Sequence, residues 1–134
     1  MAGTILKLEI ITPERVAISA ETSSVVLAAV DGYLGIWPNH APLIAALRPG
    51  TLRYRQGSGE ELVFVSGGFV EVSDNVVSIV APAAELKADI DVARAESSKA
   101  RAEERLHNRD GVDVARAEAS LARAMARINT SNGK

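Results

Sequence analysis

The hexapeptide Asp-Val-Ala-Arg-Ala-Glu occurs twice in the chain, at residues 91–96 and 113–118, and the only glycine between the two copies is Gly111. Each copy begins with an aspartate suited to the first turn of a helix and continues in residues that favour helix strongly. Apolar residues recur at helical spacing through both copies. The repeat therefore predicts two antiparallel helices joined by a short turn.

The apolar stripe of this hairpin is thin. We expect it to comprise Leu86, Ile90, Ala93 and Ala100 in the first helix, and Val114, Ala117, Leu121, Ala124, Met125 and Ile128 in the second. A buried alanine methyl contributes much less than the roughly 1.5–3 kcal/mol of a buried Leu or Ile. Each helix is also near the length, about 12–15 residues, at which an isolated helix is marginal in water. The hairpin is therefore expected to separate or open at low cost.

The chain before the hairpin follows a different pattern. All five prolines and eight of the ten glycines lie at or before Pro82. Short apolar and β-branched runs, among them residues 6–10, 62–65, 69–72 and 76–80, alternate with turn residues. Many short strands in so few residues predict an antiparallel β-sandwich, or flattened barrel, over residues 1–84. Residues 85–134 are then a second module, the mobile αα-hairpin.

Composition excludes several classes of function. The chain has no cysteine, which excludes disulfides, a CxxC redox site and cysteine-ligated zinc. Its two histidines, His40 and His107, fall in different modules and no hydrolase or P-loop motif is present, so we expect neither catalysis nor a required metal. Only Tyr54 lies among arginines, which argues against nucleic acid. No apolar run reaches the roughly 18 residues of a membrane span, so we expect no direct membrane insertion.

Charge is distributed unevenly. Residues 87–134 carry ten basic and eight acidic side chains, a net +2, whereas residues 1–86 carry five basic and nine acidic, a net −4. A mildly basic mobile hairpin suggests docking on an acidic surface or a polyanion, which fits a generic β-sandwich adaptor. A solvated helix face with i,i+4 ion pairs explains most of the same charges. A small hydrolase is a third possibility, but the sequence shows no set of catalytic residues that supports it.

One loop carries a specific resemblance. Residues 32–43 read Gly-Tyr-Leu-Gly-Ile-Trp-Pro-Asn-His-Ala-Pro-Leu, and Pro49-Gly50 follows. This segment, together with Thr-Pro-Glu-Arg at residues 12–15 and Gly-Gly-Phe-Val-Glu-Val at residues 67–72, resembles the epsilon subunit of the bacterial F-type ATP synthase. The family carries Gly-x-x-Gly-Ile-x-x-x-His-Ala-Pro-Leu in its N-terminal sandwich. The resemblance extends over the whole chain, including the helical hairpin.

The resemblance implies a non-catalytic central-stalk, or rotor, subunit of a proton-translocating synthase. In such a subunit the sandwich binds the gamma subunit and the ring of membrane c subunits, with Tyr33, Trp37 and His40 expected in subunit contacts. The hairpin is expected to move, to contact the catalytic beta subunits and to inhibit ATP hydrolysis. The implied location is peripheral, at the cytoplasmic face of the cell membrane.

The resemblance also implies ATP as a regulatory ligand. Some bacterial members bind ATP through an Ile/Leu-Asp-x-x-Arg-Ala motif, which residues 90–95 match in full. The implied binding residues are Glu85, Ile90, Asp91, Arg94, Arg101, Arg123 and Arg127. Helical spacing independently places Arg94 with Arg101, and Arg123 with Arg127, so four guanidiniums can converge where antiparallel helices meet. The residues alone also allow Asp91 and Arg94 to be an ordinary surface pair.

Overall fold

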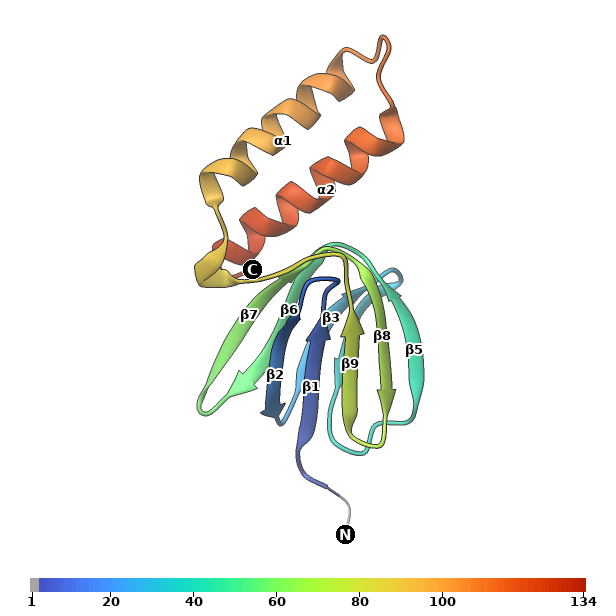
Figure 1. Cartoon of the computed structure of the whole chain (residues 1–134), viewed down its shortest axis with the longest axis vertical. Coiled ribbons are helices and arrows are strands. Elements are labelled where there is room, and N and C mark those ends of the chain that lie inside the picture. Colours follow the sequence, from blue (N-terminus) through green and yellow to red (C-terminus); the bar gives the residue numbers. More distant parts are fainter. Residues whose placement is uncertain (1–2) are drawn as a thin grey trace.

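The computed structural model describes residues 3–134, in which ten strands precede two long helices (Figure 1). The strands are β1 (Leu6–Ile11), β2 (Val16–Thr22), β3 (Val25–Ala29), β4 (Gly32–Ile36), β5 (Leu43–Leu47), β6 (Gly50–Gln56), β7 (Gly59–Val65), β8 (Gly68–Ser73), β9 (Val76–Val80) and β10 (Ala84–Leu86). A 3₁₀ turn, η1 (Lys87–Asp89), leads into α1 (Val92–His107) and α2 (Val114–Ser131). The predicted sandwich followed by a two-helix hairpin is confirmed.

The strands form one nearly closed sheet in the order β10-β7-β6-β3-β5-β8-β9-β1-β2, with β4 paired to β3. The sequence predicted antiparallel pairing, but β1 and β9 are parallel. A tight hairpin forces its two strands to be antiparallel, whereas no hairpin joins β1 to β9 and their relative direction is free. Every other strand pairing within residues 3–134 is antiparallel.

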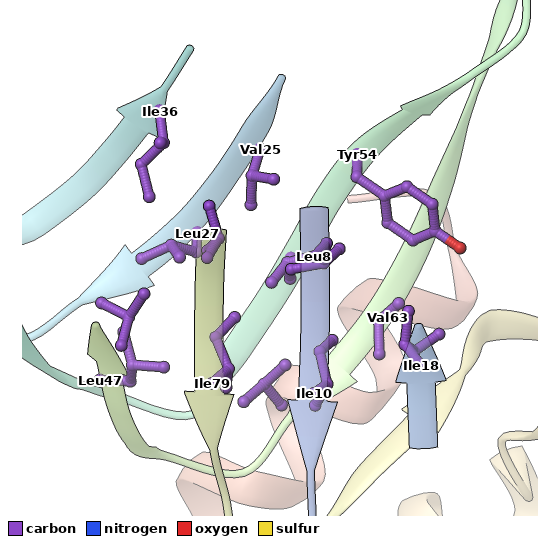
Figure 2. Close-up of a cluster of buried hydrophobic side chains, with 14 of the residues drawn as sticks. Leu8, Ile10, Ile18, Val25, Leu27, Ile36, Leu47, Tyr54, Val63 and Ile79 are labelled. Atoms are coloured by element: carbon purple, nitrogen blue, oxygen red, sulfur yellow. The ribbon is translucent and has the colours of Figure 1, made fainter. Parts of the chain in front are cut away.

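The core lies between the two layers of the folded sheet. Side chains of Leu8, Ile10 and Ile79 meet those of Val25 and Leu27 there (Figure 2), and all five are at most 1% exposed. The strands place alternate residues inward because successive side chains point to opposite faces. The predicted apolar alternation in residues 6–10 is thus confirmed as a core-facing pattern.

Strand β7 departs from this alternation, since all of Leu62, Val63, Phe64 and Val65 are buried. Val63 and Val65 belong to the sandwich core, whereas Phe64 forms a separate cluster with Ile90 and Ala126 of the hairpin module. A strand covered on both faces reads as a continuous apolar run. Phe64 therefore marks where the hairpin covers the sandwich.

Both helices begin within the repeated hexapeptide, one residue after the aspartate that was expected in the first turn. Asp91 and Asp113 are their N-caps, and each Oδ1 accepts a hydrogen bond from the backbone N–H three residues later, at 3.1 Å. Such a cap stabilises a helix by about 1 kcal/mol. Gly111 has φ +66° in the connecting turn, a left-handed conformation that glycine adopts without strain. Among residues 3–134 neither helix has the length and apolarity needed to cross a bilayer.

The predicted apolar stripe is partly wrong. The buried seam consists of Ala95 and Ala102 in α1 and of Ala117 and Ala124 in α2. Two expected members of the first helix, Ala93 and Ala100, are exposed, and Leu86 belongs to strand β10. The helix begins only after Asp91, so a stripe counted from Leu86 has the wrong phase. Met125, also expected in the stripe, is 45% exposed because the adjacent Ala126 faces the sandwich instead.

We predict that a fragment ending at Leu86 folds on its own. The main core cluster is built from residues no later than Ala84, and the fragment keeps β10 paired with β7. It should stay soluble and lose its β circular dichroism in one cooperative transition on heating, with the full chain as the reference. A disordered fragment would show that the sandwich depends on the hairpin.

Candidate functional site

A cavity of about 470 Å³ lies where the base of the hairpin meets β10 and η1. Its lining combines charged and small residues from both helices and from the linking segment: Glu85, Asp89, Asp91, Arg94, Ala95, Ser98, Ser120, Arg123, Ala124 and Arg127. The volume lies within the range of about 300–1,000 Å³ typical of small-molecule sites. One wall comes from the continuous segment of β10, η1 and α1, and the other comes from α2, so the cavity requires the two helices to be closed on each other.

Five of the seven residues expected to bind a nucleotide line this cavity, namely Glu85, Asp91, Arg94, Arg123 and Arg127. Ile90 lies instead in the apolar cluster with Phe64 and Ala126. Arg101 does not line the cavity, although its Nη2 donates to Oγ of the lining residue Ser98 at 3.1 Å. The expected convergence of four guanidiniums is therefore a convergence of three.

Three polar lining residues were not identified from the sequence: Asp89, Ser98 and Ser120. Ser98 lies four residues after Arg94, and Ser120 lies three residues before Arg123, so helical spacing alone identifies both as neighbours of the arginines. Asp89 belongs to η1, a short turn for which the sequence gives no periodic signal.

Arg127 is the most constrained cation of the cavity. Its Nε donates to Glu85 Oε1 at 3.0 Å and its Nη2 to Glu85 Oε2 at 3.3 Å, a two-point contact between α2 and β10. Its Cζ also lies 4.4 Å from the centroid of the Phe64 ring. The guanidinium therefore stacks on an apolar ring through its face while its edge binds a carboxylate, a geometry that lysine cannot reproduce.

The remaining charges leave room for an anion. The lining holds three arginines and three carboxylates, so its formal charge is zero. However, one carboxylate already pairs with Arg127, and Asp91 accepts the helix-capping bond from the backbone of Arg94. Within residues 3–134, neither Arg94 nor Arg123 makes a side-chain hydrogen bond or salt bridge. A ligand with a polyanionic end and hydrogen-bond donors at its other end complements this arrangement.

The hairpin is fastened to the sandwich at the end of α2. Thr51 Oγ1 of β6 and Thr130 Oγ1 of α2 lie 2.7 Å apart and both residues are buried. The Thr130 hydroxyl donates to the Ala126 carbonyl at 2.8 Å, so the Thr51 hydroxyl donates to Thr130. Arg53 Nη2 adds a hydrogen bond to the Gly133 carbonyl at 3.2 Å. These contacts hold the end of α2 against β6.

Residues outside the loop between β4 and β5 fix the conformation of that loop. Asn39, with φ +68°, donates its N–H to Asn75 Oδ1 at 2.6 Å and its side-chain amide to the Gly3 carbonyl at 3.1 Å. The Trp37 ring packs where a side chain at Gly35 would lie, and it remains 56% exposed. The loop is thus preorganised, which lowers the entropic cost of a contact.

The three expected contact residues lie on β4 and on the loop that follows it. His40 is half-buried, with Nδ1 2.7 Å from the Ala41 carbonyl oxygen, and its backbone N–H donates to the Trp37 carbonyl at 3.2 Å. Tyr33 is the second residue of β4, whereas Trp37 follows the last residue of that strand. The Tyr33 ring is 66% exposed and lies under the Arg48 guanidinium, 5.1 Å from ring centroid to Cζ. The Trp37 ring lies over Gly35, which stands between Trp37 and Tyr33 along the strand.

An apolar row crosses the outer face of the sandwich. Cross-strand register aligns Ala46, Phe69, Val80, Ile11 and Val16 on β5, β8, β9, β1 and β2. Phe69 is 61% exposed, and Val80 and Val16 are each 54% exposed. Ile44, two residues before Ala46 on β5, is 74% exposed. Contiguous exposed apolar side chains of this kind mark a surface that binds another protein.

Comparison with known proteins places both modules. Residues 5–87 match the family described as ATP synthase, Delta/Epsilon chain, beta-sandwich domain, and residues 88–132 match the corresponding long alpha-helix domain. The chain is 51% identical over 105 residues to the ATP synthase epsilon chain of Symbiobacterium thermophilum, covering 78% of this chain and 76% of that one. It is 48% identical over 106 residues to the epsilon chain of Pelotomaculum thermopropionicum, covering 79% of each.

Solved structures share the fold. A chain in the cryo-EM structure of Euglena gracilis mitochondrial ATP synthase, OSCP/F1/c-ring in rotational state 1, superposes with a TM-score of 0.81 at 18% sequence identity. The match covers 100% of this chain and 84% of that one, so both modules take part in it.

We predict that Thr130→Val weakens docking of the hairpin. The substitution keeps the shape of the side chain but leaves the buried Thr51 hydroxyl without its acceptor, which costs about 1–3 kcal/mol. Amide hydrogen exchange in the last turns of α2 should accelerate about fivefold or more, while exchange in the core of β8 and β9 stays unchanged. Asn129→Ala, at an exposed neighbouring position, is the control.

A double variant makes the test specific. Thr51→Val combined with Thr130→Val removes both hydroxyls, so the loss should be smaller than the sum of the two single losses. Additive losses would show that the two hydroxyls do not act as a pair.

Proposed function

The chain belongs to the family of ATP synthase delta/epsilon chains, and we propose that it is a non-catalytic rotor subunit in the central stalk of a proton-translocating F-type ATP synthase. The single observation that carries this proposal is the match of both modules, in order, to the two domains of that family. The rest of the proposal concerns what each surface of the molecule binds. The assembled position is peripheral, at the cytoplasmic face of the cell membrane.

The apolar row defined by Phe69, Val80 and Val16 binds the gamma subunit. It lies on the layer formed by β5, β8, β9, β1 and β2, whereas the hairpin contacts β6 and β7. Permanent interfaces have apolar centres, and a flat sheet face with exposed Phe, Val and Ile provides one. Because the two surfaces use different strands, the hairpin can move while the sandwich stays attached to gamma.

The loop carrying Trp37 and His40 contacts the ring of c subunits. The preorganisation of this loop supports the assignment, since Asn75 and Gly3, from two other parts of the chain, form hydrogen bonds with Asn39. An exposed indole and a half-buried imidazole on a fixed loop give an amphipathic contact with little ordering cost. Tyr33, on β4 itself, extends the contact surface along that strand.

The cavity at the hairpin base binds ATP as a regulatory ligand. Arg94 and Arg123, from different helices, are free to bind phosphate oxygens, while Asp89 and Asp91 can accept hydrogen bonds from the amino group or the ribose hydroxyls. Bound ATP bridges α1 and α2 and so favours the closed hairpin. Ligand binding shifts an equilibrium only through its difference in affinity between two states, and the open hairpin has no such cavity.

Loss of ATP then releases the hairpin towards the catalytic beta subunits. The basic side chains of the helices meet acidic groups there and block rotation, which inhibits ATP hydrolysis. The thin alanine seam supports this step, because four buried methyl groups resist separation weakly.

We predict that Phe69→Ser and His40→Ala separate the two rotor contacts. Truncating a central apolar anchor typically costs about 2 kcal/mol or more, so Phe69→Ser should weaken binding to the catalytic core complex containing gamma at least about tenfold. His40→Ala should leave that affinity unchanged and reduce ATP-driven proton pumping per ATP hydrolysed in the complete synthase. Met125→Ser, an exposed apolar residue of the hairpin, is the control. If Phe69→Ser bound this complex as tightly as the parent does, the apolar row would not be the surface that binds gamma.

We predict that Arg94→Ala and Arg123→Ala each weaken ATP binding to the isolated chain by about tenfold or more, since each removes a charge-assisted hydrogen bond. Isothermal titration gives the dissociation constants, with the exposed Arg15→Ala as a charge-matched control. In the assembled enzyme both variants should increase inhibition at a fixed ATP concentration. Deleting residues 87–134 should abolish inhibition; ATP affinity equal to that of the parent would exclude this cavity.

A further inference from the structure

A second cavity, of about 460 Å³, lies along the hairpin towards its turn. Both helices and the turn line it, through Arg105, Gly111, Val112, Asp113, Arg116, Ala117, Ser120 and Arg123. Two of these residues, Ser120 and Arg123, also line the first cavity. The two cavities therefore adjoin, and Arg123 stands at their boundary.

A matched pattern in the two helices produces this arrangement. In α1 the polar residues Arg94, Ser98, Arg101 and Arg105 follow one another at spacings of four, three and four, and in α2 Arg116, Ser120, Arg123 and Arg127 have the same spacings. These spacings keep each set on one face of its helix. Over 11 residues such a row extends about 16 Å. Two antiparallel rows thus line a groove, and every member of the two rows except Arg101 lines one cavity or the other.

The outer cavity has an excess of positive charge. Three arginines face it against the single carboxylate of Asp113, a net charge of +2. That carboxylate already accepts a hydrogen bond from the backbone N–H of Arg116 as the cap of α2. Among residues 3–134, Arg105, Arg116 and Arg123 make no side-chain hydrogen bond or salt bridge. Unneutralised guanidiniums held close together favour the binding of an anion.

We propose that this outer cavity is a phosphate-binding site, separate from the nucleotide cavity. Guanidiniums supplied by two helices can contact several oxygens of one tetrahedral anion, and each arginine presents a planar fork of donors that matches phosphate geometry. Bound phosphate joins Arg105 of α1 to Arg116 of α2 near the turn, and so stabilises the closed hairpin at the end opposite its docking contacts. Through Arg123 it also competes with the phosphates of a ligand in the first cavity.

The site is tested by titrating the full chain with inorganic phosphate at constant ionic strength, adjusted with sodium chloride, and following the amide NMR signals of residues 105–123. The parent should show saturable shifts. Arg105→Ala and Arg116→Ala should each weaken phosphate binding by about tenfold, the loss of one charge-assisted hydrogen bond. Arg15→Ala, at an exposed position of the sandwich, should bind phosphate as the parent does.

A second comparison separates the two cavities. Arg116→Ala should retain ATP affinity, Arg94→Ala should retain phosphate affinity, and Arg123→Ala should lose both. Equal loss of phosphate binding in Arg94→Ala and Arg116→Ala would place the anion in the first cavity and overturn the proposal. Absence of saturable shifts in the parent, or equal weakening in Arg15→Ala, would also overturn it. Failure of ATP to bind any variant or the parent would leave the phosphate result standing on its own.

A phospholipid headgroup carries the same phosphate chemistry, so binding to membranes is tested in parallel. Any binding to vesicles containing phosphatidylglycerol should be the same for Arg116→Ala as for the charge-matched Arg15→Ala, because a headgroup at a flat surface does not enter a groove between two helices. Vesicle binding that depends on Arg116, without binding of inorganic phosphate, would overturn assignment of the site to free phosphate.

Discussion

The closed molecule depends on one row of contacts, in which Arg127 packs on Phe64 and binds Glu85, and Thr130 binds Thr51. The Phe64 side chain projects from the outer face of β7. In the cross-strand register, Phe64 pairs with Glu85 of β10 on one side and with Thr51 of β6 on the other. Arg127 covers the ring and binds the carboxylate, while Thr130 reaches the threonine. One row of three side chains across three strands therefore fixes the end of α2. Everything that lines the two cavities is positioned from that end.

The contact of Arg127 with Glu85 changes how the arginines of the hairpin act. Clustered arginines without an anion repel one another, which opposes the closed state. Arg127 does not contribute to that repulsion because the Glu85 carboxylate neutralises its charge. The unpaired cations are then Arg94 and Arg123 in the first cavity and Arg105 and Arg116 in the second. Arg127 is thus engaged in docking, whereas these four arginines of the same helices are available to a ligand.

The sequence predicts those features that follow from local periodicity. Alternation in residues 6–10 indicates a core-facing strand, and the repeated hexapeptide indicates both helices and an aspartate near the start of each, Asp91 and Asp113. Periodicity does not determine where a helix begins, so the stripe counted from Leu86 selects Ala93 and Ala100 in place of Ala95 and Ala102. Contacts between distant segments, such as the parallel pairing of β1 with β9, leave no local pattern. Arg101 has the right spacing, but its side chain turns to Ser98.

The free energy that holds the hairpin on the sandwich is similar in size to the free energy that a bound ligand contributes. Opening the hairpin exposes Phe64 and Ile90, each contributing roughly 1.5–3 kcal/mol, and leaves the main core cluster intact. The partly exposed ion pair of Arg127 and Glu85 adds only about 0–1 kcal/mol. A ligand at 100 to 1,000 times its dissociation constant stabilises the state that binds it by about 2.7–4.1 kcal/mol. Because these quantities are comparable, the proposed regulatory ligand is able to shift the hairpin between its closed and open states. The proposed gamma contact uses the apolar row on the opposite layer and is independent of that shift.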